Sequence, residues 1–126
     1  MKIESSKTFE TLKTLKNTGY VTLISLAAED LSPNLEGESE FLLTYTLYNP
    51  VTKAFEEIET TVNSEIHSVS SLFKSANYDE CEIYDLFGIK FKNHPNLKRI
   101  FLDENFEGHP LKNDYKQDKT LPEREI

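Results

Sequence analysis

The sequence predicts an α+β fold: a small antiparallel sheet of about three strands, packed with two to three helices and followed by an extended irregular segment. Three observations support this fold class. The chain has 126 residues, which fits one domain with its own core. Residues 20–62 alternate apolar and polar side chains with period two, whereas residues 69–87 have helical spacing. Beyond Gly88 the periodicity fades, so we divide the chain into a body over residues 1–88 and a C-terminal segment over residues 89–126, one domain overall.

A short amphipathic helix is expected near the start of the chain. Its apolar stripe consists of Phe9, Leu12 and Leu15. Ser5 and Ser6 precede this stripe and offer a hydroxyl for the N-cap. Gly19 is placed to end the helix, because glycine adopts the left-handed conformation common after a helix C-terminus.

The first strand is expected over residues 20–28. Strict alternation puts Ile24 and Leu26 on one face and Leu23 on the other. Residues 30–40 then contain several acids, a proline and a glycine, which predicts a solvated loop.

A β-hairpin with one solvent-exposed face is expected next. Residues 40–48 are rich in aromatic and β-branched side chains, and residues 54–62 resume the alternation with Ile58 pointing inward and Glu57 outward. The intervening residues 49–53 contain Asn-Pro, which favours a turn.

From residue 68 the spacing becomes helical. The apolar positions are Val69, Leu72, Phe73 and Ala76. Ser68 is the expected N-cap of this helix. A second helical series follows residue 77 and runs to Phe87, where Gly88 is placed to stop it.

The composition excludes several classes of protein. A single cysteine, Cys81, excludes an internal disulfide framework and any multi-cysteine iron–sulfur or zinc site carried by this chain alone. No run of about 18 apolar residues is present, so no membrane span is expected, and residues 1–4 lead into no apolar signal segment. The formal charge of −8 at pH 7 disfavours general nucleic-acid binding.

One cluster of carboxylates stands out as candidate chemistry. Its members are Asp79, Glu80, Glu82 and Asp85. Such a cluster can hold a hard metal ion or supply an acid–base pair, and Glu82 and Asp85 lie one helical turn apart. The favoured interpretation is structural: the acids complement the helix dipole and pair with bases such as Lys98 and Arg99.

Other catalytic or metal-binding patterns are weak. The histidines His67, His94 and His109 lack metal-ligand spacing, and no nucleophile signature surrounds Cys81. The four glycines form no phosphate-binding loop. We therefore assign no catalytic, cofactor-binding or metal-ligating residue, and we expect no small-molecule substrate.

Aromatic and basic side chains are interleaved in the second part of the chain. They are Phe87, Phe91, Phe101, Phe106 and Tyr115 with Lys90, Lys92, Lys98, Arg99 and Lys112. This mixture suits either stacking of single-stranded nucleic acid or a protein–protein contact. Residues 1–85 carry 15 acidic and six basic side chains, whereas residues 86–126 carry seven and eight. Such a charge break is typical of an acidic body followed by a segment that lies on a partner.

Three motifs in this region resemble a known family. They are Glu80-Cys81-Glu82-Ile83-Tyr84-Asp85-Leu86-Phe87-Gly88-Ile89-Lys90-Phe91, His94-Pro95-Asn96-Leu97-Lys98-Arg99-Ile100 and Glu107-Gly108-His109-Pro110-Leu111. Their order is similar to that in the 30 kDa subunit of respiratory complex I, which is also the C subunit of NADH-quinone oxidoreductase. The same family includes the small D subunit of Ech-type energy-converting membrane-bound nickel–iron hydrogenases. Cys81 departs from the family pattern, which usually has an arginine there.

The resemblance implies a non-catalytic, cofactor-free subunit in the peripheral arm of a membrane complex, at the cytoplasmic face. The chain length favours the ferredoxin-linked hydrogenase, with the corresponding complex I subunit as the alternative and a single-stranded nucleic-acid binding module as an alternative of another class. The nickel–iron centre and iron–sulfur clusters are then expected in a hydrogenase-like large subunit and an iron–sulfur small subunit, through which the chain reaches the membrane. The implied partner-docking residues are Glu80, Glu82, Asp85, Phe87, Gly88, His94, Pro95, Arg99, Gly108, His109, Pro110 and Leu111.

Overall fold

The structure is a computed structural model that describes residues 1–95, 97 and 108–112. Its elements are a 3-10 turn η1 (Ser5–Lys7), helix α1 (Thr8–Asn17), strands β1 (Thr22–Asp30), β2 (Phe41–Asn49), β3 (Ala54–Val62) and β4 (Glu65–His67), helix α2 (Ser75–Phe87) and strand β5 (Lys90–Lys92). The predicted α+β class is confirmed. The division at residue 88 stays a prediction, and Arg99 lies outside the described residues.

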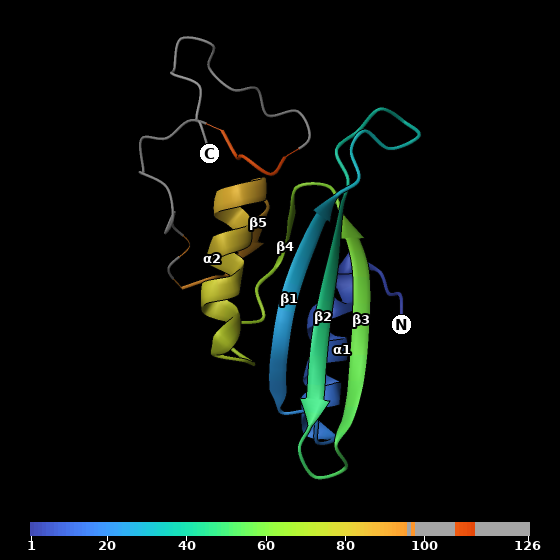
Figure 1. Cartoon of the computed structure of the whole chain (residues 1–126), viewed down its shortest axis with the longest axis vertical. Coiled ribbons are helices and arrows are strands. Elements are labelled where there is room, and N and C mark those ends of the chain that lie inside the picture. Colours follow the sequence, from blue (N-terminus) through green and yellow to red (C-terminus); the bar gives the residue numbers. More distant parts are fainter. Residues whose placement is uncertain (96, 98–107, 113–126) are drawn as a thin grey trace, which may run out of the picture.

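A three-stranded antiparallel sheet in the order β1-β2-β3 forms the centre of the body. Figure 1 shows α1 behind this sheet and α2 beside β1. The hairpin is as predicted, since β2 buries Leu43, Tyr45 and Leu47 on one face, and Ile58 of β3 joins them while Glu57 points outward. These side chains form one continuous core with Leu12 of α1.

Strand β1 departs from the strict alternation that the sequence predicts. Leu23 pairs with Leu47 and Ser25 pairs with Thr46, so Ile24 is an extra residue in a β-bulge. Leu23 and Leu26 are therefore both buried, whereas Ile24 is 52% exposed. The prediction that Ile24 and Leu26 share a face is wrong because the bulge shifts the side-chain phase by one residue.

The start of α1 also differs from the prediction. Ser5 and Ser6 lie within η1, and the N-cap position of α1 is Lys7, which makes no side-chain cap. The prediction that glycine follows the helix end is confirmed, since Gly19 has φ +117°. Its position against the side chain of Asn49 leaves no room for a Cβ.

The predicted helix from residue 68 does not form, and α2 is instead one continuous helix. Val69 and Phe73 are buried at a spacing of four because the Phe73 N–H donates to the Val69 carbonyl in a single turn, 3.0 Å. Helix α2 begins only at Ser75 and ends as predicted at Gly88, which has φ +82°. Ser68 is therefore not the cap of α2.

A second, two-stranded sheet was not predicted. β4 and β5 pair in parallel, with Ile66 opposite Phe91, and both of these side chains are buried. Strands of three residues are too short to give a period of two in a sequence. Because α2 connects β4 to β5, the chain is brought back alongside α2 as it leaves β5 (Figure 1).

Within the described ranges, none of the helices is long and apolar enough to cross a membrane.

Leu43→Ala is expected to lower the free energy of unfolding by about 2–5 kcal/mol, because Leu43 is fully buried and its loss leaves a cavity. Leu42→Ala, one residue earlier on the opposite and partly exposed face of β2, is the matched control and should cost less than half as much. Urea unfolding of both variants measures the difference. Equal losses would contradict the assignment of the inward face.

Candidate functional site

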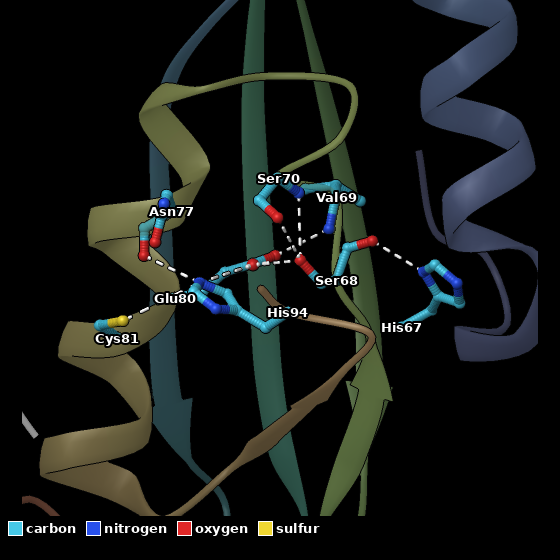
Figure 2. A network of polar contacts seen from close by, with 8 residues as sticks. All are labelled: His67, Ser68, Val69, Ser70, Asn77, Glu80, Cys81 and His94. Carbon is cyan, nitrogen blue, oxygen red and sulfur yellow. Dashed lines mark hydrogen bonds and ion pairs between the residues drawn. The ribbon is translucent and has the colours of Figure 1, made fainter. Parts of the chain in front are cut away.

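The carboxyl group of Glu80 lies at the centre of a buried polar network (Figure 2). Glu80 is fully buried on the inner side of α2. Its Oε1 accepts a hydrogen bond from Ser68 Oγ, 2.6 Å, and its Oε2 accepts one from the Val69 N–H, 2.9 Å. One side chain of α2 thus fixes the connection between β4 and α2. The N–H of Ser70 also donates to Ser68 Oγ, 3.1 Å.

His94 brings the chain after β5 into the same network. Its side chain is fully buried, and Nε2 lies 3.7 Å from Glu80 Oε1. The same nitrogen lies 3.1 Å from the carbonyl of Asn77, which can only accept, so Nε2 carries a hydrogen. Cys81 Sγ lies 3.8 Å from it. Figure 2 shows the imidazole beside α2, with dashed lines to Asn77, Glu80 and Cys81 of that helix.

Burial raises the pKa of Glu80 to about 7. The hydrogen bonds from Ser68 and Val69 act in the opposite direction and lower the pKa, but their effect is smaller than that of burial. The neighbouring charge of Asp79 raises the pKa further. Burial likewise raises the pKa of Tyr45, with a smaller contribution from the charge of Glu80. Glu80 is therefore a buried carboxyl that changes protonation close to neutral pH.

A second set of contacts ties residues 108–112 to the C-terminal end of α2. His109 Nδ1 donates to the carbonyl of Asp85, 2.8 Å, and the Leu111 N–H donates to the carbonyl of Leu86, 2.8 Å. The last carbonyls of a helix receive no N–H from the helix itself, so the C-terminal segment supplies these donors. A Cβ at Gly88 would lie 2.8 Å from the His109 ring, so only glycine permits this approach.

A shallow groove of about 420 Å³ lies next to this junction. It is lined by Glu38, Ser39, Phe41, Asn63, Ser64, Phe87, Gly88 and Lys112. The rings of Phe41 and Phe87 meet edge to face at 6.3 Å and are buried, so they close the groove from below. The groove is thus lined by polar and aromatic side chains.

The structure divides the predicted docking residues into groups. Glu80 and His94 meet in the buried network, while Gly88, His109 and Leu111 meet at the end of α2. Among the other described docking residues, Asp85 and Phe87 are buried, and Glu82 and Pro110 are half-buried. Pro95 and Gly108 are exposed. Whether any of them contacts a partner remains a prediction.

Sequence reasoning missed the roles of Ser68, Val69 and Asn77 in this site. In the sequence Ser68 is a polar residue before an apolar series, but its partner is the carboxyl group 12 residues later. The Val69 N–H and the Asn77 carbonyl are backbone groups, so no residue type in the sequence marks them.

The geometry argues against two of the chemical alternatives. In the part of the chain that the structure describes, no three His, Cys, Asp or Glu side chains are grouped to hold a metal ion. Of the aromatic side chains considered for stacking on nucleic-acid bases, Phe87 and Phe91 are buried, 9% and 2% exposed, and so are unavailable. The site holds segments of the chain together by hydrogen bonds, which is a positioning role.

Comparisons with known proteins give a consistent set of similarities. The family model described as "Respiratory-chain NADH dehydrogenase, 30 Kd subunit" matches residues 1–121. The chain is 35% identical over 117 residues to the C subunit of NADH-quinone oxidoreductase from Citrifermentans bemidjiense, covering 90% of this chain and 71% of that protein. It is 36% identical over 106 residues to NADH-ubiquinone oxidoreductase subunit 9 of Reclinomonas americana, covering 82% of this chain and 50% of that one.

A solved structure points the same way. The trypsin-resistant fragment of Nqo5 superposes with a TM-score of 0.61 at 26% identity, covering 76% of this chain and 80% of that chain. The C subunit of NADH-quinone oxidoreductase from Geobacter sulfurreducens is 40% identical over 81 residues, 62% of this chain. The chain spans about half the length of this protein and of the Reclinomonas relative.

Glu80→Gln is expected to stabilise the protein progressively as the pH rises. A carboxyl whose pKa is raised by folding contributes its full stability below the unfolded value of 4.5, and that stability is lost as the pH rises through about 7. The amide keeps an acceptor for Val69 and has no such loss. Urea unfolding should therefore show a gap in favour of Glu80→Gln that grows to at most about 3 kcal/mol at pH 8. A gap that does not change between pH 4.5 and pH 8 would contradict the raised pKa.

Gly88→Ala is expected to detach residues 108–112 from α2. The variant combines a left-handed φ of +82° with a clash against His109. Gly37→Ala is the matched control, since Gly37 has φ +78° but nothing within 4 Å of the added Cβ. Each should lose about 1–2 kcal/mol from the unfavourable φ, and only Gly88→Ala should accelerate hydrogen exchange at the Leu111 amide. Unchanged exchange at Leu111 in Gly88→Ala would contradict this role for the glycine.

Proposed function

The chain belongs to the family of the 30 kDa subunit of respiratory-chain NADH dehydrogenase, and we propose that it is a non-catalytic accessory subunit of a complex I-type NADH-quinone oxidoreductase. The observation that carries this proposal is the family match over residues 1–121, together with relatives named as subunits of NADH oxidoreductases. The enzyme activity would belong to the assembled complex.

The comparisons reverse the order of the two complexes, hydrogenase and complex I, that the sequence led us to expect. From the sequence we expect an energy-converting nickel–iron hydrogenase, with complex I as the alternative. The relatives reported above are named as NADH-quinone or NADH-ubiquinone oxidoreductase subunits, which favours the alternative. We therefore place complex I first.

The side-chain geometry supports a positioning role. Glu80 and His94 hold the chain after β5 on α2, and Gly88 lets His109 approach the end of the same helix. The C-terminal segment is thus anchored to the acidic body at two points. In this proposal its remaining surface docks on the large subunit and on the neighbouring iron–sulfur subunit, in the peripheral arm on the cytoplasmic side. Those partners would carry the redox centres and link the chain to the membrane.

The tagged chain should co-purify with NADH-oxidoreductase subunits from detergent-solubilised membranes. Leu111→Asp should reduce this recovery, because Leu111 is 52% exposed at the end of the anchored segment. Val51→Asp is the matched control, since Val51 is 88% exposed in the turn between β2 and β3, at the other end of the sheet, and should leave recovery unchanged. Quantitative mass spectrometry of the purified complexes measures the result. Recovery of the chain alone would refute the proposal, and recovery of a hydrogenase large subunit would favour the hydrogenase.

A further inference from the structure

We propose that Glu80 and His94 form one proton-binding latch, which holds the start of the C-terminal segment on α2 when Glu80 is protonated and loosens when Glu80 ionises. The latch is a property of the chain itself and does not depend on which complex the chain joins. Its two members come from α2 and from the residues after β5.

The contacts of Glu80 with Ser68 and Val69 are compatible with both protonation states of its carboxyl group. The Val69 N–H donates to Oε2 in either state. The Ser68 hydroxyl lies 2.6 Å from Oε1 and 2.9 Å from Ser70 Oγ. It donates to a carboxylate, or accepts from a carboxylic acid while it donates to Ser70. The contact that changes between the protonated and the ionised state of Glu80 is therefore the one with His94.

The other titratable groups around Glu80 do not compensate its charge. Tyr45 of β2 stays neutral because burial raises its pKa. Asp79, on α2, adds a second negative charge that disfavours ionisation of Glu80. Cys81 lies against the imidazole. Among the residues that the structure describes, His94 is the basic side chain within 4.0 Å of the carboxyl. While His94 is neutral, an ionised Glu80 is thus a fully buried charge, and access to water relieves its cost.

Opening at His94 would give this access without breaking the hydrophobic core. β5 ends at Lys92, and His94 is outside the hydrophobic core that links the sheet and both helices. Asn93 has a left-handed φ of +66°, so the chain turns sharply just before the imidazole. Lifting residues 93–95 would break their contacts with His67 and Asn77 and would uncover Glu80 and Cys81, while the three-stranded sheet stays paired.

The direction of the pH dependence follows from the two states of Glu80. In the closed state its pKa is about 7, whereas in the open, solvated state it returns toward its ordinary value of 4.5. Between these values the closed state holds one more proton than the open state, so opening becomes easier as the pH rises. The change is at most about tenfold per pH unit and levels off above pH 7, with a limit of about 300-fold in total.

Cys81 is a built-in reporter of this opening. It is the single cysteine of the chain, is buried, and contacts His94. The experiment measures the reaction rate of the folded full chain with a pyridyl disulfide from pH 4.5 to pH 8. Dividing by the rate of the urea-unfolded chain at the same pH removes the intrinsic pH dependence of the thiol and gives a protection factor. The wild-type protection factor should fall across this range and then level off.

Three variants separate the latch from other causes. Glu80→Gln should give a protection factor that no longer falls as the pH rises, since an amide does not ionise. Glu82→Gln is the matched control, because Glu82 is a half-buried carboxyl on the same helix outside the network, and it should keep the wild-type profile. His94→Asn should lower the protection at every pH, because the imidazole that covers Cys81 is lost. Hydrogen exchange at Tyr45 in β2 should stay slow throughout, which separates local opening from global unfolding.

A flat wild-type profile would overturn the proposal, as would a Glu80→Gln profile that keeps the wild-type slope. Loss of protection at Tyr45 in parallel with Cys81 would also overturn it, since the opening would then be global. If Glu80→Gln does not fold, the wild-type, Glu82→Gln and His94→Asn profiles still decide the outcome.

Discussion

The buried carboxyl of Glu80 is the interaction on which the arrangement of the second half of the body depends. It binds the Ser68 hydroxyl and the Val69 amide at the start of the loop before α2, and it meets His94 after β5. Two separate stretches of chain are therefore fixed to one side chain of α2. A buried carboxyl costs free energy unless its oxygens are hydrogen-bonded, and this cost is what makes the arrangement specific.

The end of α2 provides the second constraint. The last carbonyls of this helix accept hydrogen bonds from His109 and Leu111, and the approach is possible because Gly88 has no side chain. The same glycine ends the helix and admits the C-terminal segment. These contacts agree with the proposed function. They hold the chain's own segments in place, so the chain can present a fixed surface to a partner.

Much of the fold was predictable because local rules act over a few residues. The β2–β3 hairpin follows from strict alternation around a turn, and the helix end follows from Gly88. The errors arose where a local pattern had two explanations. The spacing of Val69 and Phe73 fits a helix, but here it marks a single turn, because α2 begins only at Ser75. The bulge at Ile24 and the three-residue strands β4 and β5 leave no periodic signal.

The α+β class, the acidic body with a more basic C-terminal part, and membership of the complex I 30 kDa subunit family all follow from the amino-acid sequence. Its motifs also identify Glu80 and His94 as residues of interest. What these two side chains contact depends on the folded chain. The parallel pairing of β5 with β4 returns the chain to α2, and this long-range pairing places an imidazole beside a carboxyl 14 residues away. Burial of that carboxyl, and hence its protonation near neutral pH, arises from segments that pack together only in the folded chain.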